Sequence, residues 1–108
     1  MGFKEVKQKA IRALKEGLVQ HEARDEVDEK NLLLTGEVTS GQVVRLLNAC
    51  HGTQYTCAPH HQVTAIDVHV FKPKTRLEPG ADMKRWYIKL YFLEPDVWFI
   101  SVHESKKE

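Results

Sequence analysis

The sequence lacks the features that would point to a secreted or membrane protein. Its two cysteines, Cys50 and Cys57, are too few for a disulfide framework and do not form a CxxC pair. It contains no signal-peptide pattern, and its apolar stretches are far shorter than the ~20 residues that a membrane-spanning helix requires. We therefore expect a cytoplasmic protein that has no membrane partner.

The sequence also lacks an excess of charge of either sign. Sixteen Lys and Arg residues oppose fifteen Asp and Glu residues, the formal net charge is +1, and 42% of the residues are hydrophobic. This balance argues against disorder, and 108 residues suit a single domain, 1–108, with one modest core. Residues 72–89 carry six cations and two carboxylates, so a folded chain is expected to show one positive face.

Two segments have apolar residues at helical spacing. Residues 3–16 form the first expected helix, which ends at Gly17, and residues 40–50 form the second, which Thr39 or Ser40 caps. Residues 18–35 between them are less regular. Their acidic part fits a loop or a helical turn, KNLLLTG fits a short helix or strand, and the region has room for an added strand.

Three later segments alternate in the way that is typical of strands. They are IDVHVF (66–71), RWYIKLYFL (85–93) and VWFISVH (97–103). Pro79-Gly80 lies in an expected flexible loop over 74–83, and residues 94–96 form an expected tight turn. The expected fold class is α+β, with two N-terminal helices packed on one face of a small antiparallel sheet, a three-stranded meander in the C-terminal half.

Alternation assigns the strand side chains to two faces. Trp86, Ile88 and Leu90 are expected to face the helices, together with Val68 and Val70. The opposite face is expected to collect Asp67, His69, Phe71, Tyr87, Lys89, Tyr91, Phe99, Ser101 and His103. One face of an antiparallel sheet is often simply solvated, but two histidines, two tyrosines and a lysine together favour a functional surface.

The stretch QYTCAPHHQVTAIDVHVFKP, residues 54–73, also contains the ligand types of a metal site. Zinc binds cysteine and histidine, and Cys57, His60 and His61, with His69 or Cys50, supply them at a permissible spacing. Adjacent histidines seldom both reach one ion, however, and the sequence has no second paired half-site. The sequence also has no signature of a Cys57 nucleophile that a histidine activates. For these reasons we expect no metal and no cofactor.

Several short motifs resemble those of the MqsR-type toxins of bacterial toxin–antitoxin systems. The helix SGQVVRLL precedes the aromatic Tyr55, which stands in QYT where the family has FYK. A strand ends in FKP at residues 71–73, and a hairpin strand carries YIK at residues 87–89. The opening IRALKEG and the lysine-containing tail are also similar, so the resemblance covers most of the chain.

The resemblance implies a RelE-like fold and a metal-independent endoribonuclease toxin that cleaves mRNA and is controlled by an antitoxin protein. Of the four site positions that it implies, the tyrosine is kept as Tyr87. The family's two lysines become Thr56 and His103, and its glutamine falls on Val68. Either the chemistry has moved to the histidines, or the protein is a non-catalytic RNA- or protein-binding module with a related fold.

Metal-free RNA cleavage needs a base, an acid and cations, and histidine suits both proton transfers because its ordinary pKa lies near neutrality. The expected catalytic residues are His61, Tyr87, His103, His69 and Lys89. The expected RNA-binding residues are Tyr55, His60, Lys72, Lys74, Arg76 and Arg85. The leading hypothesis is an endoribonuclease of a type II toxin–antitoxin system that inhibits translation and growth.

Overall fold

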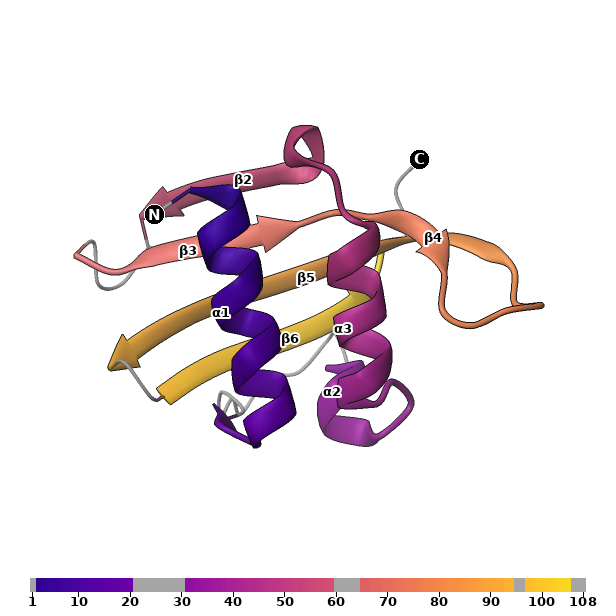
Figure 1. Cartoon of the computed structure of the whole chain (residues 1–108), viewed down its shortest axis with the longest axis horizontal. Coiled ribbons are helices and arrows are strands. Elements are labelled where there is room, and N and C mark those ends of the chain that lie inside the picture. The colour runs from indigo at the N-terminus through magenta and orange to yellow at the C-terminus, as the bar shows by residue number, and fades with distance from the viewer. Residues whose placement is uncertain (1, 21–30, 60–64, 95–96, 106–108) are drawn as a thin grey trace.

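The computed structural model describes residues 2–20, 31–59, 65–94 and 97–105. These residues form an α+β fold with three α-helices and a mixed sheet of six strands (Figure 1). The helices are α1 (Phe3–Glu16), α2 (Leu32–Thr35) and α3 (Ser40–Ala49), with a 3-10 helix η1 (Gly52–Gln54) after them. The strands are β1 (Val19–Gln20), β2 (Tyr55–Pro59), β3 (Asp67–Phe71), β4 (Lys74–Arg76), β5 (Met83–Glu94) and β6 (Val97–Glu104).

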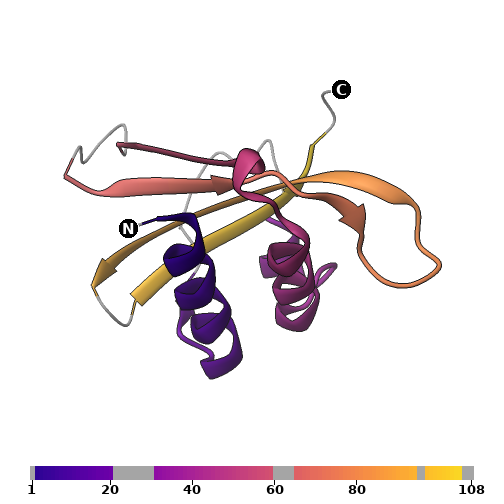
Figure 2. The ribbon, with the colours of Figure 1, turned by 45° about the horizontal axis from the view of Figure 1, so that its top comes forward.

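The strands lie in the order β1-β6-β5-β3-β2, and β4 pairs with β5 beyond the end of β3. β1 runs parallel to β6, and the other pairings among the described residues are antiparallel. Figures 1 and 2 show α1 and α3 side by side across one face of this sheet. The three predicted strands and the added strand in residues 18–35 are therefore confirmed, but the expectation of a small antiparallel sheet is corrected, because the sheet has six strands and is mixed.

The predicted helix over 3–16 is confirmed as α1. Its buried residues Val6, Ala10, Ala13 and Leu14 recur every three or four positions, so they form one stripe that belongs to the core. Gly17 ends the helix at φ 74°, which glycine adopts without the clash of a Cβ, and its N–H donates to the Ala13 carbonyl.

The second predicted helix is confirmed as α3, which ends one residue earlier than expected. Thr39 caps it, because its hydroxyl accepts from the Gln42 N–H while the Gln42 side chain accepts from the Thr39 N–H. Val43, Leu46 and Leu47 are buried and join the core.

A single side chain, Asn31, ties the short helix α2 to the edge of the sheet. Its Oδ1 accepts from the Leu33 N–H, which caps α2, and from the Val102 N–H of β6 at 3.0 Å. Its Nδ2 donates to the Ile100 carbonyl at 3.2 Å. Among the described residues, β1 pairs with β6 at Trp98 and Phe99. The Asn31 amide pairs with β6 further along the strand, at Ile100 and Val102.

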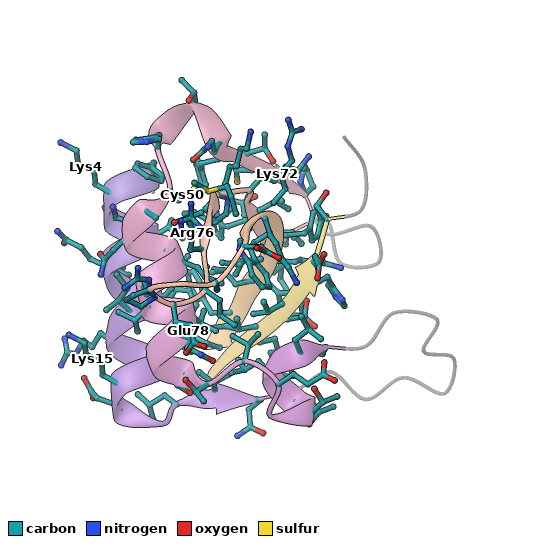
Figure 3. The ribbon with its side chains drawn as sticks, turned by 90° about the vertical axis from the view of Figure 1, so that its right-hand side faces the viewer. Lys4, Lys15, Cys50, Lys72, Arg76 and Glu78 are labelled. Atoms are coloured by element: carbon teal, nitrogen blue, oxygen red, sulfur yellow. The ribbon has the colours of Figure 1, made fainter. Side chains whose placement is uncertain are left out.

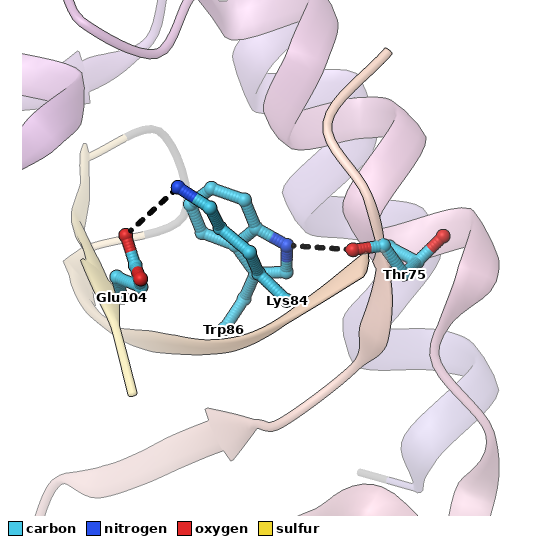
Figure 4. Close-up of polar contacts among 4 residues, drawn as sticks. All are labelled: Thr75, Lys84, Trp86 and Glu104. Carbon is cyan, nitrogen blue, oxygen red and sulfur yellow. Dashed lines mark hydrogen bonds and ion pairs between the residues drawn. The ribbon is translucent and has the colours of Figure 1, made fainter. Parts of the chain in front are cut away.

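Residues 74–76 form a strand, so the prediction of a loop from 74 to 83 is wrong in its first part. β4 pairs with the start of β5, and the Trp86 indole N–H donates to the Thr75 carbonyl at 3.1 Å. Figure 4 shows this bond beside the ion pair between Lys84 and Glu104, whose atoms are 3.3 Å apart. The connection turns at Pro79-Gly80, where Gly80 has φ 89°, a conformation that suits glycine.

The assignment of faces is confirmed in β5 and wrong in β3. Ile88 and Leu90 are fully buried, and their Cα partners in β3 are Phe71 and His69. Phe71 and His69 therefore face the helices, and they are 0% and 2% exposed. Val68 and Val70, which were expected in the core, lie on the opposite face and are partly exposed.

The physical reason is that DVHVF has apolar side chains on both faces, the two valines on one and Phe71 on the other, so alternation alone cannot orient it. The larger Phe71 gains more from burial than a valine does. Its ring packs 6.0 Å from the Phe3 ring of α1 and 5.0 Å from the Tyr55 ring.

β2 is the last strand on its side of the sheet. The Lys72 N–H donates to the Gln54 carbonyl, so the pairing with β3 begins at Gln54. Because antiparallel pairing alternates, the backbone groups of Tyr55, Cys57 and Pro59 point outward from the sheet. The first carbonyl of η1 accepts the Tyr55 N–H.

Candidate functional site

The face of the sheet opposite α1 and α3, which we call the open face, carries a row of three polar side chains. Tyr87 of β5 pairs with His103 of β6, and their ring centroids are 6.4 Å apart. On the other side of β5, the Lys72 Nζ lies 5.8 Å from the centre of the Tyr87 ring. We call His103, Tyr87 and Lys72 the His103 row. The predicted placement of Tyr87 and His103 on one face is confirmed.

A second row, the Val70 row, lies next to the first. Ser101 pairs with Lys89, Lys89 with Val70, and Val70 with Thr56 of β2. Thr56 is exposed and the other three are partly exposed. The row therefore presents one cation, two hydroxyls and one apolar side chain beside His103 and Tyr87.

A third row is apolar. Tyr91 of β5 pairs with Phe99 of β6, and their rings stack at 5.1 Å with 10° between the planes. Val68 of β3 and Ala58 of β2, which pair with each other, continue the row. The expected position of Tyr91 on this face is confirmed, although Tyr91 is only 7% exposed.

The cations gather at the opposite end of the open face. Lys74 pairs with Arg85 one step beyond the His103 row, and both are exposed. Figure 3 shows Lys72 on the side of the sheet away from the helices and Arg76 nearer to them. Arg76 donates to the Ala81 carbonyl, and its own carbonyl accepts from Arg45 of α3. Arg76 therefore stabilises the connection between β4 and β5. The described cations of the open face are Lys72, Lys74, Arg85 and Lys89.

His69 lies apart from these rows, so its expected place beside Tyr87 and His103 is corrected. It sits on the helix-covered face, where the Tyr55 hydroxyl and the His69 Nδ1 are 2.8 Å apart. The Tyr55 ring packs against both the Phe3 and the Phe71 ring, with centroids at 5.6 and 5.0 Å. The structure thus pairs two predicted site residues with each other on the side of the sheet opposite Tyr87, Lys89 and His103.

Burial sets the protonation of this pair. It lowers the pKa of His69, against the opposing charge of Asp67, so the imidazole is neutral at neutral pH. Burial, with Cys57 and Asp67 nearby, raises the pKa of Tyr55 to about 12. Among the described atoms the His69 Nε2 is buried and has no hydrogen-bond partner.

The zinc hypothesis depends on His60 and His61, which lie outside the described residues, as does any role of these two in catalysis or RNA binding. Cys50 is buried at the end of α3, which raises the pKa of its thiol. Cys57 is exposed on β2. In the part of the chain that the structure describes, no three His, Cys, Asp or Glu side chains lie close enough together to hold a metal ion.

Sequence reasoning missed the two valines of the open face. Val68 and Val70 were assigned to the core, although the triplet FKP contained a usable signal. Pro73 is buried and Lys72 is exposed, which fixes Phe71 as the inward residue of the strand. Counting back from Phe71 places His69 inward and both valines outward.

Comparison of the sequence with models of protein families and with curated proteins gave no match. None of the helices in the described residues has the length and apolar character needed to cross a membrane.

Proposed function

We propose that this protein is a metal-independent endoribonuclease, the toxin of a type II toxin–antitoxin pair, and that it cleaves mRNA on its open face. One observation carries the proposal. The four positions that the resemblance to MqsR-type toxins implies are Thr56, Val68, Tyr87 and His103, and they come from four strands onto this one face. A chance resemblance of short motifs has no reason to select one face of the sheet.

The reaction that suits the His103 row is an intramolecular transesterification at the phosphorus atom of the RNA backbone. The ribose 2′-oxygen forms a bond to phosphorus and the bond from phosphorus to the 5′-oxygen breaks, leaving a 2′,3′-cyclic phosphate and a 5′-hydroxyl. One proton leaves the 2′-hydroxyl and one reaches the 5′-oxygen. We assign one of these two transfers to His103, the described histidine of the open face.

The neighbouring side chains suit the charge that develops on the phosphate. The Tyr87 hydroxyl can donate to a phosphate oxygen, the Lys72 amine lies over the Tyr87 ring, and Lys89 stands two positions further along β5 on the same face. Lys74 and Arg85 are placed to bind the next phosphate along the strand. An antitoxin that covers this face would shield both the proton-transfer group and the cations.

The test is cleavage of single-stranded RNA by the purified protein in EDTA. We expect cleavage by the wild type, a loss of about 100-fold or more for His103→Ala and of about tenfold for Tyr87→Phe. His51→Ala removes an exposed histidine outside the three rows and should cleave normally. If the protein does not cleave RNA in EDTA and its induction does not inhibit growth, the proposed enzymatic function is refuted. Full activity in both open-face variants would refute the site.

A second candidate is a non-catalytic RNA- or protein-binding module. It is favoured by Thr56 and Val68, because neither side chain can transfer protons or carry charge where the family has a lysine and a glutamine. In this case the wild-type protein binds RNA or a protein partner and leaves RNA intact. Binding that persists in His103→Ala, with no cleavage by either protein, would favour the module.

A further inference from the structure

The open face changes in character along the direction of its strands. At one end lie the stacked rings of Tyr91 and Phe99 with Val68. The Val70 row follows, then the His103 row, and then the pair Lys74 and Arg85. None of the described residues in these four rows is acidic. A ligand that lies along the strands therefore meets the partly exposed apolar side chains of Phe99 and Val68 at one end and the cations Lys74 and Arg85 at the other.

This order matches the two chemical parts of a single-stranded nucleotide chain. Cations bind the phosphates, whereas apolar and aromatic side chains contact the faces of unstacked bases. A duplex offers phosphates but hides its base faces, so it would satisfy only the basic end. Lys72 lies at the boundary, because its amine is over the Tyr87 ring in the row next to Val70.

We infer that the open face binds single-stranded RNA with its phosphates over Lys72, Lys74 and Arg85 and with a base against Val70. Which phosphate is cleaved rests on the proposed function, but the binding mode does not. Val70 is the central apolar contact, since its neighbours across the strands are Lys89 and Thr56. Thr56, the exposed cross-strand partner of Val70, supplies a hydroxyl that can donate to or accept from the edge of this base.

The experiment measures binding of an octamer that cannot be cleaved. A fluorescent 2′-O-methyl RNA octamer has no free 2′-hydroxyl, and an octamer of abasic residues has the same phosphates without bases. We expect the wild type to bind the RNA octamer on the order of tenfold more tightly than the abasic one. Val70→Thr keeps the shape but adds a hydroxyl, and it should lose most of this preference.

Two further variants separate base contact from charge. Val44→Thr makes the same change at a partly exposed position on α3 and should keep the wild-type preference. Lys72→Met should weaken binding of both octamers equally and reduce the slope of log affinity against log salt by about 0.7. Circular dichroism melting confirms that each variant is folded.

Three outcomes would overturn the inference. They are equal binding of the RNA and abasic octamers, equal binding of a duplex of the same length, and an unchanged preference in Val70→Thr. The proposed function is tested separately by cleavage. If the preference for bases depends on Val70 but the protein does not cleave unmodified RNA, the inferred binding mode stands and the proposed nuclease function is refuted.

Discussion

At the scale of single residues, the pair of Tyr55 and His69 shows how a polar group is kept inside the core. One imidazole nitrogen meets the Tyr55 hydroxyl at 2.8 Å, and the other has no partner among the described atoms. A neutral imidazole tolerates this arrangement far better than a charged one, because burial penalises the charge. The pair is therefore a source of pH-dependent stability.

We predict that acid destabilises the fold through His69. Its pKa is lowered in the folded state, so the unfolded chain takes up the proton first, near the ordinary value of about 6.5. Stability is complete above that pH and falls as the pH drops toward the folded pKa. Urea unfolding at pH 7.5 and 5.5 should show a smaller loss in His69→Phe than in the wild type.

The difference between the unfolding free energies at the two pH values isolates the contribution of the His69 imidazole. His69→Phe also leaves the Tyr55 hydroxyl without its partner, but that cost is equal at both pH values because the pKa of Tyr55 is about 12. His51→Ala, at an exposed position, should lose as much stability in acid as the wild type does. An equal acid loss in wild type and His69→Phe would contradict the assignment.

At the scale of elements, most of the fold could be predicted because its patterns are strong. Val6, Ala10, Ala13 and Leu14 have helical spacing that no strand could use, and the prediction for α1 held. The predicted orientation of β3 was wrong because its valines lie on one face and Phe71 lies on the other. Which face is buried therefore depends on partners that are distant in sequence. β4 was not predicted because its three residues, Lys74–Arg76, include no apolar side chain that would mark a strand.

The attachment of α2 shows a contact that no sequence pattern announces. Asn31 reaches the Ile100 carbonyl and the Val102 N–H across about 70 positions of the chain, by geometry alone. We predict that Asn31→Ala costs about 1–3 kcal/mol of unfolding free energy, because the cap of α2 is lost and two groups of β6 lose their partner. Urea denaturation measures the cost.

Two further substitutions serve as comparisons for Asn31→Ala. Asn31→Asp keeps the acceptor but replaces the donor to Ile100, so its cost should lie between those of wild type and Asn31→Ala. Asn48→Ala removes an exposed asparagine from α3 and should change stability by less than about 0.5 kcal/mol. A cost for Asn31→Ala as small as that of Asn48→Ala would show that the edge of β6 does not need the amide.

At the scale of the whole molecule, the sheet separates stability from the proposed chemistry. The helix-covered face holds the core and the buried Tyr55–His69 pair, and the open face holds the rows that contain His103 and Val70. The sequence identified Tyr87, Lys89 and His103 as one surface because β5 and β6 alternate cleanly. It could not separate Tyr55 from them, since it did not predict β2, the strand that turns Tyr55 toward the helices.

We predict that two chemically identical substitutions have opposite effects. Tyr55→Phe removes the partner of a buried imidazole and should lower the unfolding free energy by about 1–3 kcal/mol, with the cleavage rate per folded molecule unchanged. Tyr87→Phe should leave stability within about 0.5 kcal/mol of wild type and lower cleavage. Denaturation and cleavage measured on the same preparations test the pair, and a joint loss of both properties in either variant would contradict it.

The outer backbone of β2 has a consequence for behaviour in concentrated solution. An exposed strand edge recruits further strands and so promotes aggregation when its N–H groups are available. Of the three outward residues of β2, Tyr55 already donates its N–H to η1 and Pro59 has none, so Cys57 supplies the remaining outward N–H. One donor cannot hold an incoming strand in register, and this edge therefore resists the growth of a sheet from molecule to molecule.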